Sequence, residues 1–379
     1  DAYNVAVGFN SGGAITTGIQ NTIVGGLAGD AITTGANNVA LGYQSLTAAT
    51  TSSFNVSMGS FSMTNNILAA RNVGIGYNSL NQLNTGSATD TYNTAVGFNA
   101  GGVITSGTAN TLMGGLAGDA LTTGIDNVAL GFNALTTEDT GSRNIAIGRD
   151  ALRDFNFDGS GYNVAVGHNA GLTMTTGKES VIVGGLAGDA ITTGTRNTLI
   201  GYAAGSALVE GGSNVAIGYA ALATEDAHGT NVAIGYNVLT VQNAGAAGLN
   251  VAIGYNAAGS VTTGTANTIV GAEAGDALTT GTGNIALGFS AMSAATTEGD
   301  TVAIGRAAMS GSTLSQRAVA VGAYALEDQA HSSLTNTYNT AVGWSAGLNL
   351  TTAVRTTIVG GETANAVICL LYTSPSPRD

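Results

Sequence analysis

Short apolar stretches recur along the whole chain at an almost constant spacing. The stretch from Asn231 to Gly235, which reads N-V-A-I-G, is one of 21 versions, and 16 of the 20 intervals between closing glycines are 17 residues long. Three residues before the glycine every version has Val, Ile or Thr, and one residue before it Val, Leu, Ile or Met. Beta-branched residues two apart, with a small residue between them, predict a short strand with one buried face. Repetition at this period predicts a solenoid.

The repeat also predicts how its coils are built. Seventeen residues accommodate two short strands and two turns, so each repeat is expected to form one flattened coil. Successive coils are expected to pair as parallel strands in register, because a slip of one residue would turn Val232 and Ile234 outward. The small residue of each stretch, as in Ala40, Ala129 and Ala233, is expected on a face that a neighbouring molecule can approach closely. The fold prediction is an all-β protein, a parallel β-roll or β-solenoid of about 21 coils with a 17-residue period.

The predicted solenoid is interpreted as one continuous domain over residues 1–366. Within it, the repeats follow a second, longer period. Sequences close to N-T-A-V-G-F-N-A-G begin near residues 4, 93, 163, 250 and 339. The longer intervals fall just before these starts, which predicts four loops, 81–92, 153–162, 241–249 and 327–338, at one place on the coils. Their candidate ligand-contact residues are Asp90, Tyr92, Phe155, Phe157, Asp158 and His331. The alternative is that these loops are tolerated surface bulges.

The residues that open and close each stretch are interpreted as structural. Asn opens 17 of the 21 stretches, and stacked Asn side chains can form a hydrogen-bonded ladder and tolerate left-handed turns. The closing glycine is expected where the chain turns sharply and stacked coils leave no room for a side chain. Representative structural positions are Asn4, Gly8, Asn38, Gly42, Asn127, Gly131, Asn231, Gly235, Asn250 and Gly254. An aromatic residue follows the glycine in 11 versions, which favours a packing column over a platform for sugars.

Composition excludes several classes of protein. A net charge of −13 argues against binding to nucleic acid and to anionic membrane surfaces. Glycine is abundant at 58 residues, but it does not recur every third residue as collagen requires. The single cysteine, Cys369, cannot form a disulfide within the chain, and no apolar run approaches the roughly 18 residues of a membrane-spanning helix.

The two ends of the sequence differ from the repeat. The chain opens at Asp1 inside a repeat, so we expect a fragment whose flanking regions are missing. The repeat stops after Ala366. The segment 367–379 resembles a translated sequencing-adapter tail and is interpreted as non-native.

No constellation of residues predicts catalysis, so no enzymatic activity, cofactor or metal is expected. The segment 25–33 overlaps a calcium-binding nonapeptide, but its copies lie 70 to 89 residues apart and adjacent coils do not supply the carboxylates that calcium needs. The three histidines, His168, His228 and His331, share no ligand spacing. Neither a phosphate-binding glycine motif nor a serine nucleophile elbow is present.

The wording N-V-A-I-G, followed by a small or aromatic residue and later by Ala-Gly or Ala-Leu, resembles the head repeats of YadA-like trimeric autotransporter adhesins. The resemblance covers residues 1 to about 366. It implies a left-handed β-roll, a homotrimer, and adhesion to a host, environmental or extracellular-matrix ligand at an outer-membrane-anchored cell surface, with membrane attachment only through a missing anchor region. Similar repeats occur in tail-fibre-like proteins of phages and viruses, which implies a virion fibre as the alternative. The chain departs from bacterial heads in its 17-residue coils and in lacking stalk heptads.

Two other solenoid functions were weighed. A monomeric ice-binding solenoid would use the threonine column that includes Thr16 and Thr17, although Glu210 and Asp226 interrupt that column. An acyltransferase of the left-handed helix type would need 18-residue, three-sided coils and an active histidine, and neither the period nor the histidine placement fits. A non-enzymatic adhesive fibre is therefore the favoured interpretation.

Overall fold

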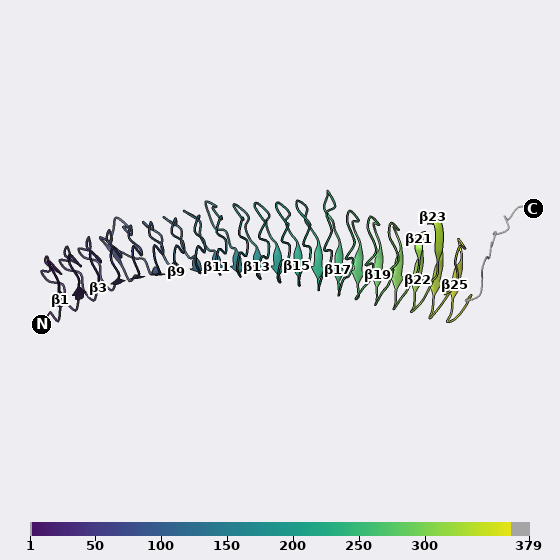
Figure 1. The fold of residues 1–379 in the computed structure, drawn as a ribbon, viewed down its shortest axis with the longest axis horizontal. Coiled ribbons are helices and arrows are strands. Elements are labelled where there is room, and N and C mark those ends of the chain that lie inside the picture. The colour runs from purple at the N-terminus through teal and green to yellow at the C-terminus, as the bar shows by residue number, and fades with distance from the viewer. Residues whose placement is uncertain (1, 365–379) are drawn as a thin grey trace, which may run out of the picture. The chain divides into compact units, whose positions relative to one another are not determined.

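The computed structural model describes residues 2–364, so the prediction for the tail 367–379 lies outside the described residues. The chain divides into two compact units, Asp1–Thr195 and Arg196–Asp379. Each unit is a stack of coils made of strands, turns and bends, and the described residues contain no helix (Figure 1).

The first unit holds eleven three-residue strands that form one parallel sheet. These strands are β1 (Val5–Val7), β2 (Thr22–Val24), β3 (Val39–Leu41), β4 (Val56–Met58), β6 (Val73–Ile75), β8 (Thr94–Val96), β9 (Thr111–Met113), β10 (Val128–Leu130), β11 (Ile145–Ile147), β12 (Val164–Val166) and β13 (Val181–Val183). Within the unit, strands of neighbouring coils pair with one another, as when Val39 pairs with Val56. The register therefore follows the 17-residue repeat.

The second unit repeats this arrangement with ten strands. They are β14 (Thr198–Ile200), β15 (Val215–Ile217), β16 (Val232–Ile234), β17 (Val251–Ile253), β18 (Thr268–Val270), β19 (Ile285–Leu287), β20 (Val302–Ile304), β22 (Val319–Val321), β24 (Thr340–Val342) and β25 (Thr357–Val359). Register survives the longer coils, because β16 still pairs residue for residue with β17 across a 19-residue interval. The predicted parallel β-solenoid of about 21 coils is confirmed.

The prediction of two strands in every coil is wrong for most coils. Beyond the sheet strand, most coils consist of turns and bends. The backbone explains this, since the N–H groups of Thr16, Thr17 and Gly18 all donate to the single carbonyl of Thr33, which bends the chain around that oxygen. An extended strand would instead direct successive N–H groups to opposite sides.

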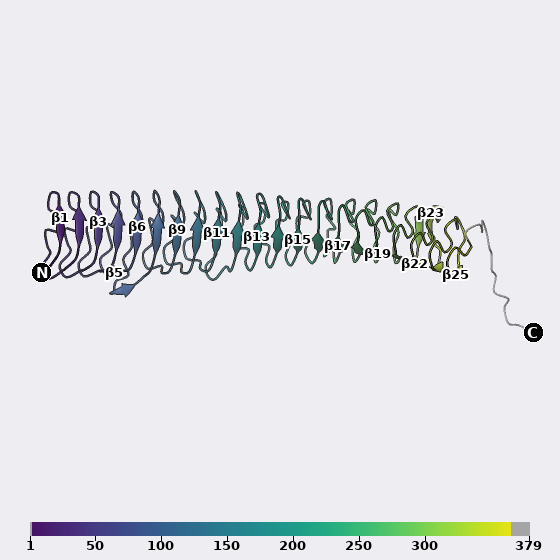
Figure 2. The same cartoon turned by 90° about the horizontal axis from the view of Figure 1, so that it is seen from below.

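Additional strand pairs occur in the described residues beside two of the longer coils. In the first unit β5 (Ala69–Ala70) pairs with β7 (Thr89–Asp90), away from the row of sheet strands (Figure 2). In the second unit β21 (Thr313–Gln316) pairs with β23 (Ala330–Asn336), on the other side of the coils from β22 and β25 (Figure 1). A single bridge joins Ser142 to Ser160 at the second longer coil, which contains residues 153–162. The extra residues thus extend the coils where the sequence placed the loops.

The orientation predicted for the sheet strands is wrong. Ala233 is fully buried, whereas Val232 and Ile234 on either side of it are half-buried and point outward. Ala40 and Ala129 are likewise fully buried and belong to the core. The corner residue four positions after the closing glycine explains the inversion in the alanine coils, because Leu239 fills the interior beside Ala233, whereas Gly29 at the same place leaves room for Ile23.

Candidate functional site

The repeat asparagines form a buried ladder that satisfies the backbone. The Oδ1 atom of Asn38 accepts the backbone N–H of Asn55 at 3.0 Å, and its Nδ2 atom donates to the carbonyl of Ser52 at 2.9 Å. The five representative asparagines, Asn4, Asn38, Asn127, Asn231 and Asn250, each accept the backbone N–H of the equivalent residue in the next coil. Their side-chain oxygens therefore hold neighbouring coils together.

The closing glycines turn the chain in a conformation that side chains disfavour. The five representative glycines Gly8, Gly42, Gly131, Gly235 and Gly254 have φ between 132° and 146°. A Cβ added to Gly42 would lie 2.6 Å from the carbonyl carbon of Gly59 in the next coil. These positions have no room for a side chain, and glycine avoids the strain of this φ.

Each unit presents an outer apolar face, defined by the first and third residues of the sheet strands and the aromatic residues that follow the glycines. In the second unit this face includes Val232, Ile234 and a row of four tyrosines. The tyrosine rings stack with centroid separations of 5.6, 5.1 and 5.5 Å along the series Tyr202, Tyr219, Tyr236 and Tyr255. The first and third strand positions carry no charged residue in any coil. Each tyrosine is about half exposed, so the rings pack on one another and still face solvent.

The first longer coil forms a pocket of about 520 Å³ beside the β5–β7 pair. Its wall includes Phe54, Arg71 and the predicted contact residue Asp90. The Arg71 guanidinium lies 4.9 Å from the Phe54 ring centroid and 5.9 Å from that of Tyr92, and its Nε donates to Asp90 Oδ2 at 2.8 Å. The neighbouring Asp90 carboxylate raises the pKa of Arg71, so the cation persists in this pocket.

The second longer coil places its predicted contact residues unequally. Phe155 is fully buried and packs in the core, so its assignment as a ligand contact is wrong. Phe157 is half-buried, with the Lys178 Nζ 5.3 Å from its ring centroid, and Asp158 is exposed and accepts a hydrogen bond from the Thr140 hydroxyl. This coil thus offers two accessible candidates and one core residue.

Buried Glu138 fixes the second longer coil in place. Its carboxylate accepts the backbone N–H groups of Gly141 and of Phe157, the latter at 3.2 Å. Burial raises the pKa of Glu138, and the two hydrogen bonds counteract that rise. Glu138 lies seven residues after its closing glycine, where other coils have a buried apolar residue such as Leu121. A hydrogen-bonded carboxylate therefore replaces an apolar core contact in this coil.

The fourth longer coil carries the predicted contact residue His331 on β23. His331 is half-buried, its Nε2 atom is buried without a hydrogen-bond partner, and burial lowers its pKa. In the same unit, Arg317 donates to the Tyr338 hydroxyl at 3.1 Å and lies 3.5 Å from the Asp300 carboxylate.

An arginine stacked on a tyrosine recurs at three of the longer coils, and the arginines were missed by the sequence analysis. The pairs are Arg71 with Tyr92, Arg143 with Tyr162, and Arg317 with Tyr338. Their ring distances are 5.9, 5.7 and 6.0 Å. A usable signal existed, because each member stands directly before the residue that opens a repeat stretch.

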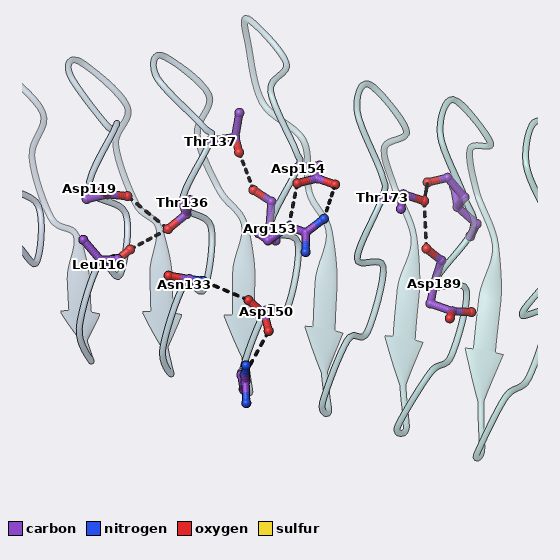
Figure 3. A network of polar contacts seen from close by, with 12 residues as sticks. Leu116, Asp119, Asn133, Thr136, Thr137, Asp150, Arg153, Asp154, Thr173 and Asp189 are labelled. Atoms are coloured by element: carbon purple, nitrogen blue, oxygen red, sulfur yellow. Dashed lines mark hydrogen bonds and ion pairs between the residues drawn. The ribbon is translucent and has the colours of Figure 1, made fainter.

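Two aspartates of the calcium-like segments, Asp119 and Asp189, lie at polar contacts between coils of the first unit (Figure 3). The Thr136 hydroxyl lies 2.6 Å from the carbonyl of Leu116 and 3.0 Å from Asp119 Oδ1. The carbonyl of Asp189 accepts the Thr173 hydroxyl at 2.7 Å, while its side-chain Oδ1 is buried without a partner. Burial raises the pKa of both Asp119 and Asp189.

The three histidines share no ligand spacing with one another, but one of them lies beside two acidic groups, which the sequence analysis did not predict. Ligand atoms of Glu225, Asp226 and His228 in the second unit all lie within 4.8 Å of one another. His168 takes the aromatic position after a closing glycine. The spacing E-D-x-H was the signal that the sequence analysis passed over.

Comparison with protein-family models, with curated proteins and with solved structures found no match for this chain. Within residues 2–364 the search for membrane spans found no helix of sufficient length and hydropathy to cross a bilayer. The outer apolar face and the longer coils are therefore the features that bear on function.

Proposed function

We propose that this chain is a segment of a homotrimeric, left-handed β-solenoid fibre that adheres to surfaces outside the cell. The observation that carries the proposal is the outer apolar face. Two uncharged columns, one of Val, Ile and Thr and one wholly apolar, run beside a partly aromatic column in each unit, although the chain as a whole has a net charge of −13. Monomeric soluble proteins rarely expose contiguous apolar patches larger than a few hundred Å².

Copies of the same chain are the best-matched cover for this face. Aliphatic residues recur on it once per coil, so a second copy presents the same spacing and meets the first coil by coil. Closed symmetric assemblies of identical chains are the commonest soluble oligomers. Three copies fit the resemblance to trimeric adhesin heads, and they leave the longer coils free to contact a ligand.

The first test is the mass of the 379-residue chain in solution, measured by light scattering after size exclusion. We expect three times the mass of one chain. A monomer at every concentration would overturn the trimer.

The second test asks whether the outer apolar face is the interface. The triple variant Val215→Glu, Val232→Glu and Val251→Glu places three carboxylates in one column of this face. It is expected to be monomeric. The matched control, Thr263→Glu, Thr280→Glu and Thr297→Glu, changes three exposed turn residues of the same unit and is expected to remain trimeric. A face variant that still formed trimers would refute this interface.

We place ligand contact at the pocket of the first longer coil. Arg71, Asp90 and the hydroxyls of Thr51 and Thr89 supply the donors and acceptors that a saccharide would use, and Phe54 supplies an aromatic wall. Arg71→Ala should abolish binding to a panel of immobilised glycans. Arg355→Ala is the control, because Arg355 is exposed at the same place in its coil but does not line this pocket. Equal binding by both variants would remove the pocket from the proposal.

The same material tests the alternatives. A virion tail fibre would share the trimer and bind a receptor on a host cell, so the binding panel includes intact bacterial cells. An ice-binding solenoid would be monomeric and would inhibit ice recrystallisation. The Thr16 hydroxyl donates to the Thr33 carbonyl at 3.1 Å, so this hydroxyl of the column already has a partner within the protein.

A further inference from the structure

Three potential metal ligands meet in the turn that follows β15. The turn places the Glu225 carboxylate, the Asp226 carboxylate and the His228 imidazole so that one ligand atom from each lies within 4.8 Å of the others. Glu225 is fully buried, His228 is mostly buried, and Asp226 is exposed, which leaves an approach from solvent.

The two inner ligands have the separation of atoms that share a metal ion. His228 Nδ1 lies 3.4 Å from Glu225 Oε1 and is buried without a hydrogen-bond partner. Two ligands at about 2.0–2.1 Å from a tetrahedral ion would lie roughly 3.3–3.4 Å apart. The backbone N–H of His228 also donates to Glu225 Oε1 at 3.2 Å, which fixes the carboxylate relative to the imidazole.

A second, independent observation is the unpartnered oxygens in the interior beside the turn. Glu225 Oε2 is buried and accepts no hydrogen bond. Gln242 stands 17 residues later, at the same place in the next coil; it is fully buried, and its Oε1 atom also has no partner. The Thr224 side chain connects the two coils here, because its hydroxyl donates to the Gln242 carbonyl at 3.3 Å. Buried oxygens without donors are costly, and a cation satisfies them.

We propose that Glu225, Asp226 and His228 form a binding site for one divalent transition-metal ion of the Zn²⁺ class. The imidazole selects for zinc-like ions over Ca²⁺ and Mg²⁺, which prefer sites made only of oxygen. The equivalent position of the next coil carries Gln242, whose unpartnered amide oxygen is the candidate fourth ligand. Sugar binding at the first longer coil does not depend on this site.

Bound metal would fasten the third longer coil to its neighbour. The segment 241–249 lies in the coil directly after the site, and its Gly248 donates to the carbonyl of Gly229 at 3.3 Å. The Gln242 Nε2 atom donates to Asn231 Oδ1 at 3.1 Å, which connects this coil to the asparagine ladder. An ion held at Glu225 and His228 would therefore resist local opening of the Val241–Leu249 loop.

The test is isothermal titration of Zn²⁺ into the full 379-residue chain that carries Cys369→Ser, so that the lone thiol contributes nothing. We expect one saturable site per chain and, with Co²⁺ in place of Zn²⁺, a visible absorption band from bound metal. His228→Asn and Glu225→Gln should each weaken Zn²⁺ binding by about tenfold or more. Matched controls are His168→Asn and His331→Asn, which should bind as the parent does.

The outcomes are separable. Absence of a saturable site in the parent overturns the proposal, as does a site that survives His228→Asn unchanged. If Glu225→Gln perturbs folding by circular dichroism, His228→Asn decides the question, because this side chain is partly exposed and can be replaced with little repacking. Loss of Zn²⁺ binding with unchanged trimer mass and glycan binding would support this site without bearing on the proposed adhesive function.

Discussion

The side-chain Oδ1 of Asn38 accepts two hydrogen bonds from Asn55 in the next coil, from its backbone N–H at 3.0 Å and from its Nδ2 at 3.3 Å. One side-chain oxygen thus satisfies the backbone of the neighbouring coil and orients the next member of the ladder. Both residues are fully buried, so water cannot replace either bond. The repeat asparagines therefore contribute to stability wherever two coils stack.

Asn38→Ala should lower the free energy of unfolding by about 2–6 kcal/mol, because it leaves the Asn55 N–H and the Ser52 carbonyl unsatisfied, at about 1–3 kcal/mol each. Urea unfolding followed by circular dichroism measures the loss. Asn38→Ser is the graded comparison, since Ser180 already fills this place in one natural coil and retains a side-chain oxygen. An alanine variant as stable as the parent would contradict the role assigned to the ladder.

Substitution by alanine should strongly destabilise the protein at Gly25 but have little effect at the adjacent Gly26. Gly25 has a φ of 138°, and a Cβ there would lie 2.7 Å from the carbonyl carbon of Gly42. Backbone strain of roughly 1–3 kcal/mol adds to this clash, so Gly25→Ala should be strongly destabilised. At Gly26 a Cβ meets only the Tyr43 ring at 3.6 Å, an ordinary contact. Thermal unfolding of both variants tests the difference, and equal stability would contradict it.

The repeat period predicted the number of coils and their register because each coil is a local unit marked by its own copy of the repeated motif. Strand orientation was not predictable in the same way. Alternation shows that Val232 and Ile234 lie opposite Ala233, but it does not say which side faces inward. The answer depends on how much room the rest of the coil leaves, and the corner residue Leu239 already occupies that space. An apolar residue is inside by default only when its neighbours do not fill the core first.

The orientation of β16 predicts unequal tolerance at neighbouring positions. Ala233→Leu should destabilise the protein by about 1–3 kcal/mol, because extra methylenes do not fit a filled coil. Val232→Thr, which keeps a beta-branched side chain on the outer face, should change stability by no more than about 0.5 kcal/mol in the isolated chain. Chemical unfolding under dissociating conditions measures both. If Val232→Thr destabilised the protein more than Ala233→Leu, the valine would be assigned to the inner face instead.

The candidate contact residues were predicted only in part, for a related reason. Counting extra residues located the longer coils, but it could not show that Phe155 returns into the core while Asp158 stays exposed. The count also could not identify Arg71. This residue lies one coil before the first loop, and its hydrogen bond to Asp90 forms only because the two coils stack on each other. Residues that meet across coils are far apart in the sequence, as Arg71 and Asp90 are at 19 positions, and their pairing becomes visible only when the coils are aligned.

The half-buried carboxyl of Asp189 predicts a pH-dependent stability. Burial raises its pKa above the ordinary value, so the folded state binds its proton more readily than the unfolded state does. Such a group contributes most stability below the unfolded-state pKa, and this contribution is lost as pH rises through the folded-state pKa. Ionised Asp189 therefore costs stability at neutral pH, where its buried Oδ1 also has no partner.

Asp189→Asn should consequently raise the melting temperature at pH 7. The gain should shrink towards zero at about pH 3, where the aspartic acid of the parent is itself largely uncharged. Asp158→Asn is the control at an exposed carboxylate that solvent already stabilises, and it should leave the melting temperature nearly unchanged at pH 7. Thermal unfolding of the three proteins at both pH values decides the matter. A gain that persisted in acid would assign the effect to packing, and a loss at pH 7 would show that the carboxylate stabilises the coil despite its burial.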